Sequence, residues 1–210
     1  MPLHHYGSWV ALTIASAVFL TIQRIIQKKV LKKEHASEYL TTFGVFAWGF
    51  LLPFIGKVDF TLSANVWILL AVKSILLSYS WLMITRAYKH MEVSLVEPLK
   101  NISPLFLLLF AAILLGELPT GMQVFGIFLI LFGGYLLESM LRPSLMNNPF
   151  KIFKGKYINY LLLAALIAGI SGVFDKWILK ETNITTMMFF MFFFSSIMLF
   201  IHQCIVYKGW

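Results

Sequence analysis

The sequence carries little charge and a single cysteine. Asp, Glu, Lys and Arg make up 12% of its 210 residues, about half of the roughly 25% found in soluble domains. Cys204 is the one cysteine, so an internal disulfide is excluded and nothing indicates an oxidising compartment. The low charge indicates a protein whose solvent is lipid. The histidines stand singly or at the extreme N-terminus, which argues against a metal site: His4, His5, His35, His90 and His202.

The motifs of common enzyme classes are also missing. The sequence contains no H-E-x-x-H, no G-x-S-x-G and no G-x-x-x-x-G-K, the patterns of zinc peptidases, serine hydrolases and phosphate-binding loops. We therefore expect neither an enzyme nor a cofactor. The net charge of +8 does not indicate a nucleic-acid partner, because Lys and Arg fall mostly in short connections between apolar runs, as in membrane proteins.

What the sequence does have is apolar residues, at 60%, gathered in long runs. A span needs roughly 20 mainly apolar residues to cross about 30 Å of hydrocarbon. The runs are too long and continuous for a membrane β-barrel, so we predict an all-α integral membrane protein with about seven transmembrane helices. The first run lacks the features of a cleaved signal peptide, and we expect it to remain as a span. The predicted spans are Tyr6–Gln27, Tyr39–Ile55, Val66–Tyr88, Ser94–Leu115, Gly121–Leu141, Ile158–Ile178 and Thr185–Tyr207.

The sixth and seventh runs repeat the first two. Sliding the chain by 148 positions places residues 175–180 opposite residues 27–32 and Phe194 opposite Phe46. A repeat unit of five helices makes the second copy enter the membrane from the opposite side, which defines an inverted-topology repeat. The chain would then hold the first two helices of a second copy, and a complete copy would add roughly 80 residues.

A sequence block that runs from the end of the fourth predicted span into the fifth carries a family resemblance. Upstream of it, residues 86–89 end the third span, Val93-Ser94 begins the fourth, and Pro104 lies inside the fourth. Together these features resemble the EamA-type domain of the drug/metabolite transporter superfamily. The block consists of Leu115, Gly116, Glu117, Thr120, Gln123, Gly126 and Gly133.

This resemblance implies a ten-helix secondary transporter built from two inverted five-helix copies. It divides the chain into a first EamA-like repeat (1–141), a linker (142–157) and an incomplete second repeat (158–210). We expect a multi-pass protein of the cell membrane, the inner membrane in a bacterium, that carries small metabolites or drugs by alternating access. The alternative is a non-transporting membrane subunit or an inactive fragment without the last three helices. The expected partners are the lipid bilayer, a small-molecule substrate, and a homodimer partner or second chain that completes the bundle.

The fourth span offers the first candidates for a substrate pathway. Four residues at i, i+3, i+4 and i+7 share one helical face, and Pro104 cannot donate to the carbonyl of Lys100. A polar face is costly against lipid, so it should face the bundle or a wet cavity. Two interpretations fit: a substrate- or proton-binding stripe, or an intrahelical pair of Glu97 with Lys100 near the membrane surface. The four residues are Glu97, Lys100, Asn101 and Pro104.

The other candidates lie in the first, third and sixth spans. In the third span, Lys73 either reaches the headgroups or lines a cavity, while small polar residues at four-residue spacing favour close helix packing. Asp175 either faces a cation in the pathway or, as we expect, pairs with Lys176 or Lys180. The candidates in these spans are Gln23, Lys73, Ser78, Trp81 and Asp175.

The connections differ in positive charge between the two sides of the membrane. Twelve Lys and Arg fall on one side and three on the other, which predicts an external N-terminus by the positive-inside rule. The resemblance to ten-helix transporters implies the opposite, with both termini in the cytoplasm. The two arguments therefore disagree on sidedness.

Overall fold

Every regular element is a helix in the part of the chain that the computed structural model describes, residues 4–141 and 155–206. The prediction of an all-α protein is therefore confirmed. The elements in chain order are α1 (His4–Val30), α2 (Ala36–Leu51), the 3₁₀ helix η1 (Leu52–Lys57), α3 (Ala64–His90), α4 (Val93–Lys100), α5 (Ser103–Leu115), α6 (Gly121–Leu141), α8 (Lys156–Glu181) and α9 (Ile184–Val206).

Six helical segments of the described residues are long and apolar enough to cross a membrane. The helix α6 adds a shorter apolar stretch, Gly121–Leu136. The prediction of about seven helices in a multi-pass membrane protein is therefore confirmed. The six segments are Val10–Val30, Ala36–Lys57, Ala64–His90, Val93–Leu115, Lys156–Glu181 and Ile184–Val206.

The fourth predicted span is interrupted, which corrects the expectation of one regular helix. The helix α4 ends at Lys100, and α5 begins at Ser103 after a turn. The amide of Asn101 donates to the carbonyls of Glu97 and Pro98 at 3.3 and 3.2 Å. Pro104, in the first turn of α5, has no N–H to continue the helical ladder. Pro98 in α4 lacks an N–H in the same way. The two prolines, Pro98 and Pro104, therefore explain why the helix is interrupted inside the span.

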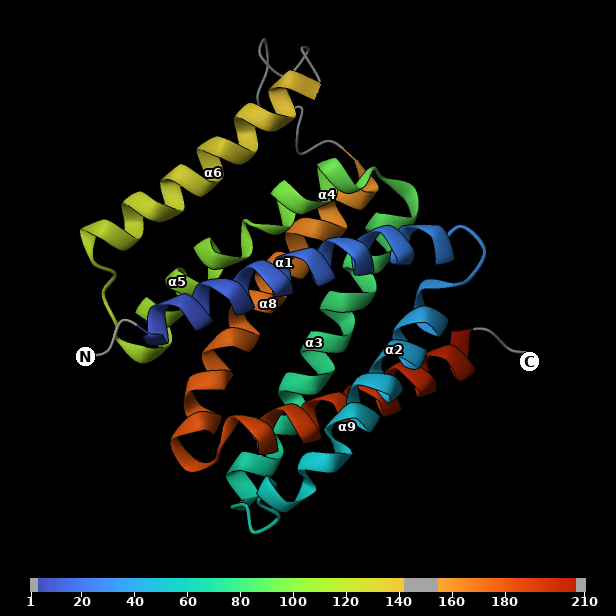
Figure 1. The fold of residues 1–210 in the computed structure, drawn as a ribbon, viewed down its shortest axis with the longest axis vertical. Coiled ribbons are helices and arrows are strands. Elements are labelled where there is room, and N and C mark those ends of the chain that lie inside the picture. The colour runs from blue at the N-terminus through green and yellow to red at the C-terminus, as the bar shows by residue number, and fades with distance from the viewer. Residues whose placement is uncertain (1–3, 142–154, 207–210) are drawn as a thin grey trace.

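The centre of the bundle is α3, which packs against α8 and α9, while α2 packs on α9 and α5 on α8 (Figure 1). The helices α2 and α9 run antiparallel. The segment after η1 meets the start of α9, where the amide of Asp59 donates to Oγ1 of Thr186 at 2.8 Å. Farther along the pair, a Cβ on Gly44 would lie 2.6 Å from Oγ of Ser196. Small residues thus allow these helices to approach closely, as is usual in membranes.

The closest approach in the bundle brings α8 against α5. A Cβ built on Gly169 would lie 2.7 Å from Cβ of Phe106 and 2.8 Å from the backbone nitrogen of Leu107. No larger residue fits there without a shift of the backbone. The glycine therefore fixes how α8 lies beside the interrupted fourth span.

The Leu-Gly-Glu block forms the turn between α5 and α6. Gly116 ends α5 in the left-handed region with φ of 67°, where glycine is favoured. The amide of Thr120 donates to Oε1 of Gln123 at 2.9 Å, and the amide of Gln123 donates to Oγ1 of Thr120 at 3.4 Å. This reciprocal pair is a capping box, which gives the spacing of Thr120 and Gln123 a physical cause.

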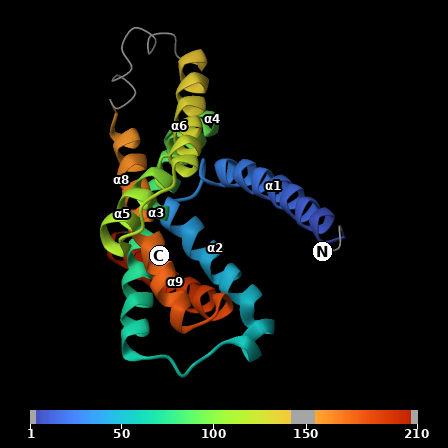
Figure 2. The same cartoon turned by 90° about the vertical axis from the view of Figure 1, so that its left-hand side faces the viewer.

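The first helix, α1, stands apart from the other helices for most of its length (Figure 2). Only 6% of its most apolar window is buried, and Val10, Leu12 and Phe19 are among its exposed apolar residues. Its C-terminal end is anchored, because Nζ of Lys28 donates to the carbonyls of Tyr88 and Met91 at 2.5 and 2.6 Å. The prediction that a homodimer partner or second chain completes the bundle stays a prediction.

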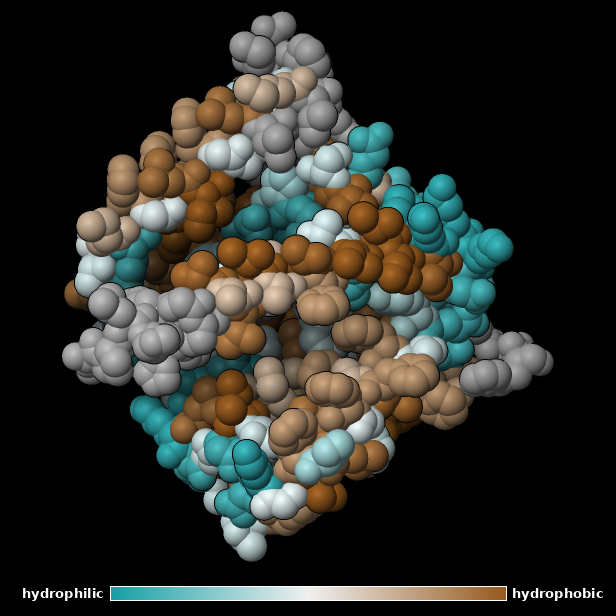
Figure 3. All heavy atoms as spheres, viewed as in Figure 1, coloured by the Kyte–Doolittle hydropathy of each residue, from teal (hydrophilic) through white to brown (hydrophobic). Residues whose placement is uncertain are grey.

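On the face that Figure 3 shows, hydrophilic residues gather at the right and at the lower left, and most of the surface between them is apolar. At one end, Nζ of Lys89 donates to the carbonyl of Glu34 at 2.9 Å. At the other end, Nδ2 of Asn183 donates to the carbonyl of Lys57 at 3.1 Å. The helices therefore cross alternately between two polar ends. Sidedness and the inverted repeat stay predictions, and most of the predicted linker 142–157 lies outside the described residues.

Candidate functional site

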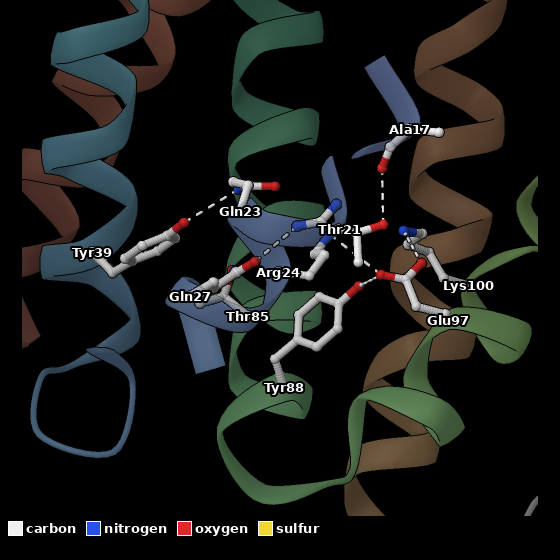
Figure 4. Close-up of polar contacts among 10 residues, drawn as sticks. All are labelled: Ala17, Thr21, Gln23, Arg24, Gln27, Tyr39, Thr85, Tyr88, Glu97 and Lys100. Carbon is white, nitrogen blue, oxygen red and sulfur yellow. Dashed lines mark hydrogen bonds and ion pairs between the residues drawn. The ribbon is translucent and has the colours of Figure 1, made fainter. Parts of the chain in front are cut away.

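A polar cluster joins α1, α3 and α4 at the carboxylate of Glu97 (Figure 4). Its Oε1 accepts a hydrogen bond from the hydroxyl of Tyr88 and lies 3.3 Å from Nε of Arg24. Its Oε2 accepts from Nζ of Lys100 at 2.6 Å. Both carboxylate oxygens are therefore occupied, by donors from three different helices.

Arg24 reaches this cluster from the last third of α1. Its Nη1 donates to Oε1 of Gln27 at 2.8 Å, and its guanidinium carbon lies 5.2 Å from the centre of the Tyr88 ring, within cation–π range. Gln27, which is buried, donates in turn to Oγ1 of Thr85 at 3.4 Å. The guanidinium is thus held in place by a ring, an amide and a carboxylate.

The two interpretations of the fourth span both describe part of this arrangement. The intrahelical pair of Glu97 with Lys100 is present, but Glu97 also binds partners on α1 and α3. Asn101 and Pro104 do not join the cluster, since both are exposed and lie beyond the end of α4. The expectation of one continuous face through these residues is wrong, because the turn after Lys100 breaks the helical spacing.

An open cavity of about 350 Å³ lies between α1 and α4. Its size falls in the range of about 300 to 1,000 Å³ that small-molecule sites occupy. Arg24, Glu97 and Lys100 contribute charge to its wall, and Leu20, Ile25 and Val93 contribute apolar surface. The arrangement can hold a small molecule with a polar end and an apolar body.

A second ionic contact links α8 to the N-terminal half of α3. Lys73 is 3% exposed and forms an ion pair with Asp175. Of the two interpretations of Lys73, reaching the headgroups is therefore wrong. The expected pairing of Asp175 with Lys176 or Lys180 is also wrong. Lys176 instead pairs with Glu117 of the Leu-Gly-Glu block, since consecutive residues of a helix point to different neighbours.

The remaining candidates of the third and first spans act in packing. The hydroxyl of Ser78 donates to the carbonyl of Ser74 at 2.6 Å. The Trp81 ring stacks on Phe192 of α9 with centroids 5.8 Å apart. Nε2 of Gln23 donates to the hydroxyl of Tyr39 at 3.2 Å, which ties α1 to α2. These contacts agree with the packing interpretation of the small polar face.

Sequence reasoning missed Arg24, Tyr88 and Pro98. Arg24 is one of the twelve positive residues that the charge count assigns to one side of the membrane, and Tyr88 is the last residue of the third predicted span. A usable signal existed for Pro98, because a second proline six residues before Pro104 makes a regular helix improbable. For metals, no group of three or more His, Cys, Asp or Glu gathers within residues 4–141 and 155–206.

Comparison with known proteins places these observations in a family. Residues 7–138 match the EamA-like transporter family. The match covers more than half of the chain, so this protein belongs to the EamA-like transporter family, as the sequence block indicated. No solved structure matches the chain.

One curated relative is a riboflavin transporter, ImpX, of Fusobacterium nucleatum subsp. nucleatum. It is 31% identical to this chain over 114 residues, which are 54% of this chain and 37% of the relative. The chain therefore matches little more than a third of that transporter's length.

Proposed function

We propose that this protein is a secondary carrier that moves small molecules across the cell membrane, the inner membrane in a bacterium, by alternating access. The family and the membrane-spanning helices support a transporter. Membrane carriers of this kind place their substrate sites within interrupted helices near irregular backbone. The turn between α4 and α5 is an interruption of that type.

The observation that carries the proposal is the charged wall of the cavity between α1 and α4. Arg24, Glu97 and Lys100 all lie within apolar membrane-spanning segments. Ionisable groups at such positions are costly and usually serve a substrate or ion pathway. The three side chains are 27%, 35% and 27% exposed, so a solute entering the cavity would reach them.

Each side chain has a role in the proposed cycle. Arg24 and Lys100 bind the polar end of the substrate. Glu97 holds both cations while the site is empty and yields them when the substrate arrives. Lys73 and Asp175 form a second polar contact on the other half of α3, which we assign to the same pathway.

Counterflow in proteoliposomes tests this proposal, with riboflavin as the first solute because the relative ImpX is named for it. Vesicles that contain the full chain and unlabelled riboflavin should take up labelled riboflavin faster than empty vesicles and saturably. The exchange would show that one site faces each side in turn. Flux that is linear in concentration and unaffected by preloading, for riboflavin and for a panel of metabolites, would overturn the proposal.

Two variants then test the site within the transporter. We expect Glu97→Gln and Lys100→Met to lower counterflow about tenfold or more. Lys100→Met removes a cation that binds the substrate, and Glu97→Gln removes the carboxylate that takes the cations back when the substrate leaves. Lys29→Gln is the matched control, since it removes an exposed cation of α1 that does not line the cavity. Unchanged counterflow in both site variants would contradict the site and leave the transporter proposal standing.

The competing function is a non-transporting membrane subunit, which the sparse packing of α1 favours. A subunit of that kind would purify with a second chain or as a homodimer and show no counterflow on its own. Sizing by light scattering in detergent, beside the counterflow assay, separates the two functions. A monodisperse preparation with saturable counterflow supports the carrier.

A further inference from the structure

We infer that the cavity between α1 and α4 selects an organic anion of single negative charge with an apolar body. This inference rests on the proposed function and specifies its substrate class. The cavity wall carries more positive than negative charge. Hydrogen bonds and ion pairs hold each charged side chain in place.

The imbalance is one positive charge. Arg24 and Lys100 are cationic side chains, and the described residues of the cavity wall supply Glu97 as their counter-charge. One carboxylate thus serves two cations, through Oε1 for Arg24 and Oε2 for Lys100. In a low-dielectric environment an uncompensated charge is costly, so a monoanion in the cavity would complete the neutralisation.

The donors also fit a carboxylate in geometry. A guanidinium has five N–H donors in a planar fork, and two of its atoms are directed to Gln27 and Glu97. The Lys100 ammonium has three donors, of which one meets Glu97. Donors on both cations thus remain for an incoming anion, and Arg binds carboxylates through paired hydrogen bonds.

The rest of the cavity wall selects the body of the ligand. Leu20, Ile25 and Val93 line it beside the charged residues. A small inorganic anion would leave this apolar surface wet, whereas an aromatic or aliphatic carboxylate would cover it. The ligand is therefore amphipathic, with its charge at Arg24 and Lys100 and its body against the apolar residues of the cavity wall.

The probes 2-naphthoate and 2-naphthamide test the inference because they share a ring system and differ in charge. The full chain is placed in nanodiscs of phosphatidylcholine, and binding is measured by calorimetry. We expect the naphthoate to bind at least about tenfold more tightly than the amide. Equal affinities would overturn the inference.

Removing a cation and removing the carboxylate should change naphthoate binding in opposite directions. Lys100→Gln and Arg24→Gln should reduce the preference for naphthoate to less than about threefold, because the cavity becomes neutral. Glu97→Gln should strengthen naphthoate binding several-fold, because it removes the competing carboxylate. Damage to the fold cannot make binding tighter, so a gain of affinity in Glu97→Gln supports the inference. A loss of affinity in a Glu97→Gln protein that unfolds at the same temperature as the unmodified protein contradicts it. Arg24→Lys, which keeps the charge, should retain most of the preference, and Lys29→Gln should retain all of it.

A second arm separates a soluble anion from a lipid headgroup. Replacing a third of the phosphatidylcholine by phosphatidylglycerol should leave naphthoate affinity within about twofold once surface potential is corrected. Complete loss of naphthoate binding would assign the site to anionic lipid and overturn the inference. Selective naphthoate binding without counterflow of any solute would overturn the proposed function instead. Counterflow of neutral solutes without preference for naphthoate would overturn the inference alone.

Discussion

The Nε atom of Arg24 in α1 lies 3.3 Å from Oε1 of Glu97 in α4. This contact connects the least packed helix of the bundle to the span that is interrupted by a turn. It also brings a second cation to a carboxylate that Lys100 already binds. The cavity beside these residues is therefore charged, although its walls belong to membrane-spanning helices.

Removing the hydroxyl of Tyr88 tests how strongly the cluster holds α3 to α4. We expect Tyr88→Phe to destabilise the protein by about 1–2 kcal/mol, since a hydrogen bond to a charged group is lost while Arg24 and Lys100 still bind Glu97. Thermal unfolding in detergent measures the change. Tyr79→Phe on the same helix is the control, because Tyr79 is 45% exposed, and it should change stability by less than about 0.5 kcal/mol.

Breaking the Lys73–Asp175 pair should destabilise the contact of α3 with α8. We expect Lys73→Met to cost about 1–3 kcal/mol, because it leaves a carboxylate without its counter-charge. The cost is below that of a fully buried pair, since the Asp175 side chain is 37% exposed. Combining Lys73→Met with Asp175→Asn should restore part of the loss in a double-mutant cycle. Additive effects of the two substitutions would show that the pair contributes nothing.

The Glu117–Lys176 pair should contribute far less to the stability of the protein than the Lys73–Asp175 pair does. Its side chains are 52% and 47% exposed, and exposed pairs contribute about 0–1 kcal/mol. Glu117→Gln should therefore shift the unfolding temperature by no more than a few degrees. A loss as large as that of Lys73→Met would mean that the Leu-Gly-Glu block stabilises the bundle through its charge.

Close packing of α8 on α5 makes Gly169 sensitive to a single methyl group. We expect Gly169→Ala to destabilise the protein by about 1–3 kcal/mol through overpacking against Phe106 and Leu107. Gly49→Ala in α2 is the matched control, because nothing lies within 4 Å of its added Cβ. It should stabilise the protein by about 0.4–1 kcal/mol. Equal effects at the two positions would contradict the close contact of α8 with α5.

The sequence predicts local features well and long-range contacts poorly. Hydropathy alone locates the apolar helical segments, although not the break between α4 and α5. The spacing of Glu97 and Lys100 predicts their pair on α4. The capping of α6 by Thr120 and Gln123 also follows from neighbouring residues. Arg24 escaped prediction because its role depends on where α1 crosses α3 and α4, which no local pattern records. The partner of Asp175 lies on another helix, and the nearby Lys176 and Lys180 were the obvious but wrong choices.

Access to the cavity from both sides of the membrane tests the account most directly. Thr21 lines the cavity and is exposed, so Thr21→Cys in a Cys204→Ser background places one thiol in the proposed pathway. Membrane-impermeant methanethiosulfonate reagents are then applied to either face of oriented vesicles. We expect modification from each face in turn, slowed several-fold by 2-naphthoate, which we infer binds beside Thr21 at Arg24 and Lys100. Modification from one face alone, or from neither, would contradict alternating access through this cavity.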